Sequence, residues 1–417
     1  MRVVIIVLLI LAATTVSRLG NVPAAMQPAT HTVQAGDTWT ALALRYGVSV
    51  DELQAANPHF NKARQPAIGR EIDLPDHAVE RSGTLIRTGG AGVLEVAALH
   101  GLPVWEVARL NSLESPYRPT FYRPLLLPGD GTIRDLPPGM TTFELSSPMA
   151  SPGRALGLRG TTTRVGETIT ANLDGLPVSI FSVDNRFAGI VGTGAFYRGG
   201  EPELTIQVGD APAWVQPWAF AEREWEYQEL TLTGQAAEID QQARDEERAR
   251  LREIWTAVTP QPLWSTQFET PLNDVLGITA NYGARRSYNG GPYLTYHEGV
   301  DFSAYGGTPV YAPAAGTVVL AEPLYVRGGT VIIDHGIGLY SGYYHLSAVH
   351  ATAGQTVQPG DLLGEVGTTG LSTGNHLHWD LLVNGIWVDA AAWQQDGLAC
   401  WLLEGIGRAC LPPSEPE

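Results

Sequence analysis

One sequence pattern occurs twice between residues 31 and 130 of this 417-residue chain. The two copies are Gly47-Val48-Ser49-Val50 followed by Leu53 and Asn57, and Gly101-Leu102-Pro103-Val104 followed by Val107 and Asn111. Each copy closes on a Leu-Pro pair, at residues 74–75 and 127–128. A repeat of this length corresponds to one supersecondary unit, so the N-terminal part is expected to fold as two small tandem modules.

The first copy, residues 30–76, predicts a strand–helix–helix–strand unit. Apolar residues at helical spacing predict an amphipathic first helix that ends at Gly47: Trp39, Leu42, Ala43 and Tyr46. Ser49 and Glu52 have the spacing of a capping box and predict the start of a second short helix. Residues 71–74 supply the closing strand.

Both copies resemble LysM domains, which bind glycans that contain N-acetylglucosamine, such as peptidoglycan or chitin. The first copy enters its helix through the turn Gly36-Asp37-Thr38. The second copy, residues 83–130, is divergent and lacks that turn. The resemblance implies glycan binding. The alternative, a spacer without glycan affinity, applies more strongly to the second copy.

Residues 131–233 predict a small β-sandwich. Residues 167–173 alternate in polarity and end at Asp174-Gly175, a strong hairpin signal. Further short strands are predicted at residues 178–181, 187–191 and 204–208. A charged segment, residues 235–258, then predicts a solvated helix with one apolar stripe. A segment that covers an active site is the alternative.

The N-terminal residues indicate export. Arg2 precedes an apolar run from Val3 to Ala13, which is too short for a membrane-spanning helix and is typical of a signal peptide, residues 1–25. An uncleaved anchor is the alternative; after cleavage we expect no stable membrane insertion. Cys400 and Cys410 in the tail, residues 394–417, then predict a disulfide, because an exported chain meets an oxidising environment.

The charge balance excludes one class of partner. Lys and Arg number 26 against 43 Asp and Glu, a net charge of −17 at pH 7. Nucleic-acid binding requires a basic face that neutralises phosphates, so no nucleic acid is expected as a partner.

Two short histidine patterns indicate a metal site. The first is H-x-x-x-D at His297 and Asp301, and the second is H-x-H at His376 and His378. Gly299 and its β-favouring neighbours argue for an extended segment, where an even spacing puts both side chains on one face. Residues 376–381 alternate as a strand, so both histidines of the second pattern also share a face.

Imidazole and carboxylate ligands suit Zn²⁺, and three protein ligands leave a fourth position for water. The H-x-H pair cannot easily give both imidazoles to the same ion together with His297 and Asp301. One of the pair is more useful as an acid or base, and His345 could complete that role from another strand. The five residues thus divide into three ligands and two proton-handling groups.

Residues 278–393 resemble the catalytic domain of the lysostaphin-like zinc endopeptidases of peptidoglycan. The resemblance rests on NYGARR at 281–286, HEGVDFSAYGGTPVYAPAAGTVV from 297, GYYHLS from 342 and GQTVQPGDLLGEVGTTGLSTGNHLHWDL from 354. It implies that His297, Asp301 and His378 bind one Zn²⁺ ion, and that His345 and His376 serve catalysis. It also implies antiparallel sheets that form a groove over the metal, within a peptidase domain at residues 264–393.

The sequence therefore predicts a multidomain, mainly β protein: two small α+β LysM-like modules, a β-sandwich-like domain, a helical linker and a C-terminal antiparallel β-sheet metallopeptidase domain. The predicted function is a secreted zinc endopeptidase that cuts peptide bonds of peptidoglycan in the cell envelope. One alternative is a silent peptidoglycan-binding activator of another hydrolase; a second is a zinc peptidase with a target outside the wall. Glu298 as a general base is disfavoured by its odd offset from His297. His335 is expected to be structural or to line the groove.

Overall fold

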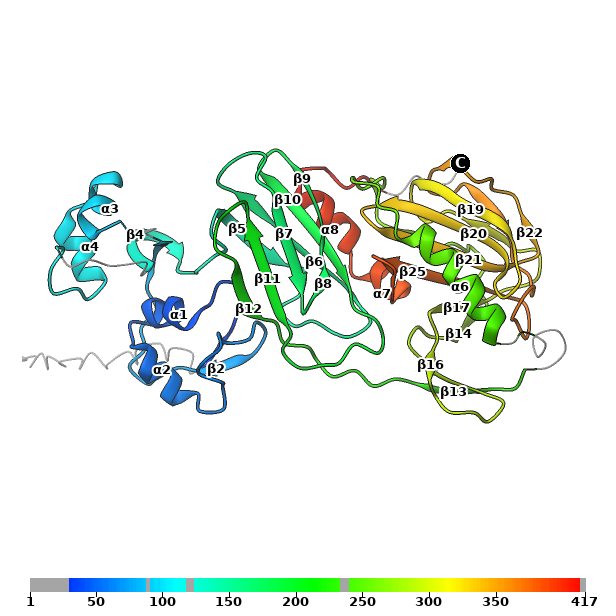
Figure 1. The fold of residues 1–417 in the computed structure, drawn as a ribbon, viewed down its shortest axis with the longest axis horizontal. Coiled ribbons are helices and arrows are strands. Elements are labelled where there is room, and N and C mark those ends of the chain that lie inside the picture. The colour runs from blue at the N-terminus through cyan, green and yellow to red at the C-terminus, as the bar shows by residue number, and fades with distance from the viewer. Residues whose placement is uncertain (1–29, 88–90, 118–123, 233–238, 240, 413–417) are drawn as a thin grey trace, which may run out of the picture.

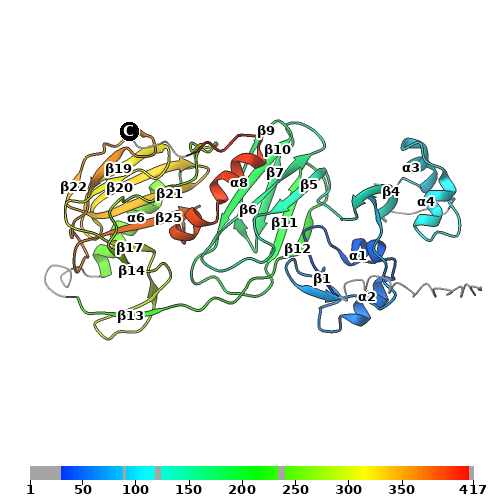
Figure 2. The same ribbon diagram turned by 180° about the vertical axis from the view of Figure 1, so that it is seen from behind.

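The computed structural model describes residues 30–87, 91–117, 124–232, 239 and 241–412, and it is mainly β, as the sequence predicts (Figure 1). Seen from either side, a two-sheet domain lies between the small N-terminal modules and a large C-terminal sheet (Figure 2). The expected signal peptide lies outside the described residues. Within the described ranges, no helix is long and apolar enough to cross a membrane.

The first module has the predicted element order: β1 (Thr30–Thr32), α1 (Trp39–Tyr46), α2 (Val50–Ala56) and β2 (Glu71–Asp73), with β1 and β2 antiparallel. The four apolar residues of α1 are buried, and the helix ends where Gly47 adopts a φ of 66°. The predicted capping box is present, because Ser49 Oγ accepts from Glu52 N and the Glu52 carboxylate accepts from Ser49 N.

The second module repeats this order: β3 (Ser82–Arg87), α3 (Val93–Leu99), α4 (Val104–Leu110) and β4 (Pro124–Thr132). Asn57 and Asn111 occupy equivalent positions and make equivalent hydrogen bonds in the two modules. Each side-chain amide donates to the carbonyl four residues earlier and to a carbonyl of the closing strand. The helices of the second module start at Gly92 and Pro103, which supply no side-chain cap. The modules therefore share a framework and differ in their helix starts.

Two four-stranded sheets form the middle domain, as residues 131–233 predict. One sheet runs β5 (Met140–Leu145), β6 (Ala155–Thr162), β10 (Arg186–Gly192), β9 (Ser179–Val183); the other runs β12 (Trp214–Pro217), β11 (Glu203–Val208), β7 (Ile169–Leu173), β8 (Leu176–Pro177). The predicted turn at Asp174-Gly175 joins β7 to β8. Phe143 and Phe187 from one sheet pack with Leu204 and Trp214 from the other, which makes a sandwich.

Gln216 joins the first module to the sandwich. This side chain is fully buried, and its amide accepts from Gly36 N at 2.9 Å. It also donates to the carbonyls of Asp37 and Pro66, each at 3.1 Å. Buried amides of this kind need partners to offset their desolvation, so these bonds fix one orientation of the first module on the sandwich.

A strand and a helix lead into the C-terminal domain. β13 (Tyr227–Leu230) pairs in parallel with β15 (Arg285–Tyr288), which pairs with β16 (Thr295–Tyr296). The charged segment contains α6 (Gln241–Trp255), while residues 235–238 and 240 lie outside the described ranges. α6 buries one stripe at helical spacing, Glu247, Leu251 and Trp255.

An eight-stranded antiparallel sheet forms the C-terminal domain. Its order is β14 (Gly277–Ala280), β17 (Gly299–Ser303), β25 (His376–Val383), β21 (Leu339–Leu346), β20 (Gly328–Gly336), β19 (Gly316–Leu324) and β23 (Thr356–Val357), with β26 (Ile386–Val388) paired to β25. A smaller sheet contains β18 (Pro309–Tyr311), β24 (Leu362–Glu365) and β22 (Ala348–Val349). One face of the large sheet packs on Trp264 and Phe268, and the other is partly covered by α6 (Figure 1).

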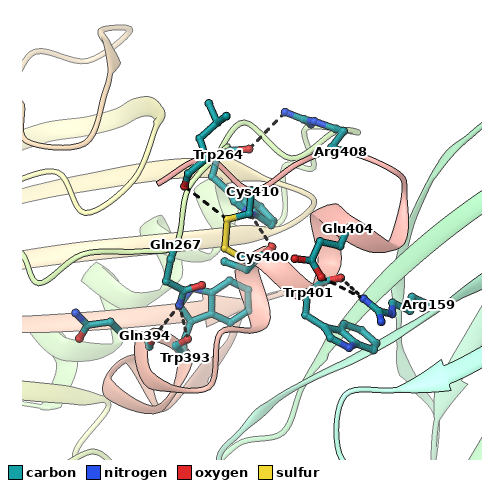
Figure 3. Close-up of a disulfide and its surroundings, with 12 residues drawn as sticks. Arg159, Trp264, Gln267, Trp393, Gln394, Cys400, Trp401, Glu404, Arg408 and Cys410 are labelled. Carbon is teal, nitrogen blue, oxygen red and sulfur yellow. Dashed lines mark hydrogen bonds and ion pairs between the residues drawn. A yellow bond between two sulfur atoms is a disulfide. The ribbon is translucent and has the colours of Figure 1, made fainter. Parts of the chain in front are cut away.

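Residues 390–412 lie between the sandwich and the C-terminal domain and pack against both. They form α7 (Ala390–Gln395) and α8 (Leu398–Gly405), and the predicted disulfide Cys400–Cys410 is present (Figure 3). We expected only a tail here, but α8 carries an apolar stripe that includes Leu402 and Leu403 and is buried. Arg159 of β6 donates to Trp401 O at 3.1 Å. The C-terminal segment is therefore part of the domain interface.

Candidate metal centre

Two neighbouring strands position the predicted ligands. β17 and β25 are antiparallel, and Asp301 lies directly opposite His378. Their neighbours Phe302 and Leu377 point into the apolar core, so strand alternation turns Asp301 and His378 to the opposite face. His297 lies just before β17 and reaches the same point. Both predicted motifs therefore lie on extended segments, as expected.

Three donor atoms converge at this point. His297 Nε2 lies 2.9 Å from His378 Nδ1 and 2.9 Å from Asp301 Oδ1. His378 Nδ1 lies 2.8 Å from the same carboxylate oxygen. In the part of the chain that the structure describes, this is the one group of His, Cys, Asp or Glu side chains arranged to hold a metal ion.

The protonation states suit metal ligands. Burial lowers the pKa of His297, and it lowers the pKa of His378 to about 3. Burial acts to raise the pKa of Asp301, but the neighbouring His297 and His378 outweigh it and hold that pKa well below the usual range. His297 Nδ1 donates to Asn281 O at 3.0 Å, which leaves Nε2 as a lone-pair donor. The centre thus offers two neutral imidazoles and an ionised carboxylate.

Two further residues fix the donors in place. Arg286 Nη2 donates to Asp301 Oδ2 at 3.1 Å, which leaves Oδ1 facing the histidines. Gly299 lies against the opposite strand, where a Cβ atom would meet Trp379 O at 2.4 Å and His378 Nε2 at 2.7 Å. Any larger residue would displace a candidate ligand, so the glycine of the H-x-x-x-D motif is required by close approach.

His345 reaches the site through a β-bulge. Tyr343 pairs with Val331 and Leu346 with Gly329, so Tyr344 and His345 together oppose a single residue of β20. His345 has a φ of 63°, a left-handed conformation that is uncommon for a residue other than glycine. Its Nδ1 donates to Thr369 O at 2.8 Å, and burial lowers its pKa to about 3.

His376 completes the group of five predicted residues. Its Nδ1 donates to Gly374 O at 2.8 Å, and its Nε2 lies 3.8 Å from Asp301 Oδ1. Its ring lies 4.8 Å from that of His345, centroid to centroid. His345 and His376 therefore form a pair beside the three converging donors, and neither joins them.

The sequence reasoning missed a buried polar network behind the donors. Asp380 accepts from Tyr344 Oη at 3.2 Å and from Trp387 Nε1 at 2.7 Å. Burial raises the pKa of Asp380 to about 7, although nearby Arg327 opposes that shift. The Tyr344 ring lies 5.5 Å from His378. The alternation of β25, which puts Asp380 on the face of His376 and His378, was the available signal.

Glu298 and His335, which were not predicted to be ligands, have other partners. The Glu298 carboxylate pairs with Arg248 of α6 and, at 3.4 Å, with Arg327. It therefore belongs to an ion-pair network and does not converge with the donors. His335 is fully buried, and its ring nitrogens contact Ala315 O at 2.8 Å and Ser341 Oγ at 2.7 Å.

Known proteins resemble both ends of the chain. The pattern of peptidase family M23 matches residues 295–390, which include all five predicted site residues, and the LysM domain matches residues 31–75. An uncharacterized metalloprotease of Haemophilus influenzae is 39% identical over 118 residues, 28% of this chain and 24% of that protein. The peptidoglycan DD-endopeptidase ShyA of Vibrio cholerae is 37% identical over 120 residues, 29% of this chain and 28% of ShyA.

Lysostaphin of Staphylococcus staphylolyticus is 34% identical over 132 residues, 30% of this chain and 27% of lysostaphin. The chain thus matches only about a quarter of the length of these relatives. The predicted resemblance is confirmed for the peptidase region and for the first module, while the LysM resemblance of residues 83–130 stays a prediction. This chain carries a LysM domain near its N-terminus and a C-terminal domain of peptidase family M23.

Proposed function

We propose that this chain is a zinc endopeptidase that hydrolyses peptide bonds in bacterial peptidoglycan. The convergence of His297, Asp301 and His378 beside two further histidines supports this most strongly. The site lies in a domain of family M23, and relatives of that domain include peptidoglycan endopeptidases. The LysM domain supports the wall as the target, because LysM domains bind glycans that contain N-acetylglucosamine, such as peptidoglycan.

The donor set fits zinc. Two imidazole nitrogens and one carboxylate oxygen are ligands that Zn²⁺ prefers, and three of them leave a coordination position open. Bound zinc supplies Lewis-acid chemistry that activates water and polarises an amide carbonyl. Arg286 and Asn281 hold Asp301 and His297 in the orientation that presents their donor atoms.

His345 and His376 are proposed as the proton-handling pair. Each imidazole donates its Nδ1 proton to a backbone carbonyl, which leaves both Nε2 atoms available for substrate. An imidazole held in this way can accept a proton at Nε2 from the attacking water and pass it to the leaving amine. The imidazolium formed in between can donate from Nε2 to the developing oxyanion. The bulge that places His345 here costs backbone strain, which is expected where a side chain must be aimed.

The remaining regions are proposed to hold this domain on the wall. After export, with residues 1–25 removed, the LysM domain binds wall glycan, and the sandwich carries the peptidase domain. Gln216 fixes the LysM domain on the sandwich, and α8 packs the sandwich against the peptidase domain. A rigid chain of contacts of this kind keeps the site near the surface to which the LysM domain binds.

The test is digestion of purified peptidoglycan by the full-length protein, with and without a metal chelator. Mass spectrometry of the released muropeptides should show cleavage at peptide bonds, lost with chelator and restored by zinc. Release that continues unchanged in chelator would overturn the zinc proposal. Binding to wall without any cleavage, with the metal present, would favour the silent activator instead.

A further inference from the structure

The N-terminal half of α6 forms a wall of the cavity that contains the candidate site. Gln241, Arg244, Asp245 and Arg248 line this cavity of about 190 Å³. His297, His345 and His378 line it as well. In Figure 1, α6 lies across the large sheet close to β17. Residues from outside the matched segment, residues 295–390, therefore border the site.

α6 is a fixed wall. Leu251 and Trp255 are buried in a cluster with Tyr344 and Trp387, on the face of the sheet that also carries the site. Glu247 is buried and accepts from Val326 N at 2.7 Å and from Arg327 at 3.1 Å. A helix held by a buried stripe and a buried carboxylate does not leave readily, because the Glu247 charge would lose its partners.

The cavity has an excess of cationic side chains, in a chain whose net charge is −17. Its charged lining consists of Arg244, Asp245, Arg248, Arg286, Glu298 and Arg327. Three of the arginines are matched: Arg248 and Arg327 pair with Glu298, and Arg286 pairs with Asp301. Arg244 is the remaining arginine of this lining.

Arg244 has no carboxylate partner among the described residues. Its Nη2 donates to Ile239 O at 3.3 Å, and its buried Nε has no acceptor there. The guanidinium lies over the Tyr288 ring, 5.1 Å from the centroid. Stacking on an aromatic face holds the guanidinium plane in one orientation while leaving its edge free for hydrogen bonds.

We propose that Arg244 is a specificity-determining residue that binds a free carboxylate of the peptide substrate, close to the cleaved bond. The inference rests on the proposed function. A guanidinium binds a carboxylate through two parallel hydrogen bonds, and such charge-assisted bonds are strong where water is partly excluded. The substrate class is then a wall peptide with a free carboxylate beside the cleaved amide. The same peptide with that carboxylate amidated is a poor substrate.

The test uses the full-length protein and two cross-linked peptides that differ only in whether this carboxylate is free or amidated. The wild-type KM for the amidated peptide should be about 10- to 100-fold higher, with a similar kcat, since a charged hydrogen bond contributes that much to binding. Arg244→Gln should raise the KM for the free acid to the amidated value. Arg244→Lys keeps the positive charge but lacks the two parallel donors of a guanidinium, so it should retain part of the KM difference between the two peptides.

Arg250→Gln is the matched control, because Arg250 lies on the exposed side of α6 and pairs with Glu322. It should keep the wild-type preference. Equal kcat/KM of the wild type for both peptides would overturn the inference, as would an unchanged preference in Arg244→Gln. Faster cleavage of both peptides by Arg244→Gln would also overturn it, because the side chain would then be an obstruction.

The experiment distinguishes failure of the proposed endopeptidase function from failure of the inference about Arg244. If the wild type cleaves neither peptide, the endopeptidase proposal fails. Calorimetry of the two peptides with chelator-treated protein still decides the inference. Tighter binding of the free acid that Arg244→Gln abolishes supports it, and equal or undetectable binding of both peptides overturns it.

Discussion

The two faces of strand β25 differ in composition and in what they contact. Leu377, Trp379 and Leu381 point into the main apolar core and are fully buried. His376 and His378 point to the opposite face, toward His345 and Asp301. Further along that face, Asp380 and Leu382 lie on the side that Trp255 of α6 covers. One strand thus contributes to stability on one face and to chemistry on the other.

The comparison shows how the site is held rigid. A residue on the core face can position a site residue only through the backbone, because successive side chains of a strand point to opposite faces. Packing of Trp379 against Phe302, with ring centroids 6.2 Å apart, locks β25 onto β17. The pairing of these two strands sets the position of His378 relative to Asp301. Substitutions on the two faces should therefore separate loss of folding from loss of function.

The largest separation is expected for His376→Ala. This change should reduce peptidoglycan hydrolysis about 10²- to 10⁴-fold, the contribution of a positioned acid or base. The unfolding free energy should change little, because His376 is partly exposed. Muropeptide release and thermal denaturation of the same preparation check both. His350→Ala, at an exposed histidine paired with Glu365, is the control and should keep full activity.

Trp379→Ala tests the core face. Removal of a fully buried indole should lower the unfolding free energy by about 3–5 kcal/mol. Denaturant unfolding measures this, and the fraction that stays folded should still bind zinc. Trp105→Ala on α4 is the control, because that indole is 58% exposed and should cost less than about 0.5 kcal/mol. Equal costs for the two tryptophans would refute the assignment of the core face.

Asp380→Asn should have the smallest effect. The amide keeps one acceptor oxygen, so either Tyr344 or Trp387 loses its partner, and the unfolding free energy should fall by about 1–3 kcal/mol. Zinc content should stay the same, because Asp380 contacts no candidate ligand atom directly. The double variant Asp380→Asn, Trp387→Phe should cost less than the sum of the single changes. Strict additivity would show that the two side chains are not coupled.

Local patterns were enough to predict much of the fold. The capping box at Ser49 and Glu52, the turn at Asp174-Gly175 and the Cys400–Cys410 disulfide are all confirmed. Each depends on residues close in sequence or on a general rule of redox chemistry. Strand alternation likewise brought Asp301 and His378 to one face, although their roles as ligands stay a proposal.

The features that the sequence did not predict depend on contacts between distant segments. The bulge at His345 follows from a register shift between β20 and β21, which no local pattern encodes. Packing of α8 on the sandwich and of α6 beside the site likewise requires knowing which apolar stripe meets which surface. The solvated helix expected at residues 235–258 has its exposed face and its buried stripe, but residues of its first two turns also line the cavity, among them Arg244 and Arg248.

The central claim is that His297, Asp301 and His378 form one zinc site. The direct measurement is the zinc content of full-length protein that has been stripped with chelator, reloaded and dialysed, measured by elemental mass spectrometry. The account predicts one tightly held zinc ion per chain for the wild type and for His350→Ala, and none for a folded His378→Ala variant. Wild-type protein that retains no zinc, or His378→Ala that retains one ion with unchanged affinity, would contradict it.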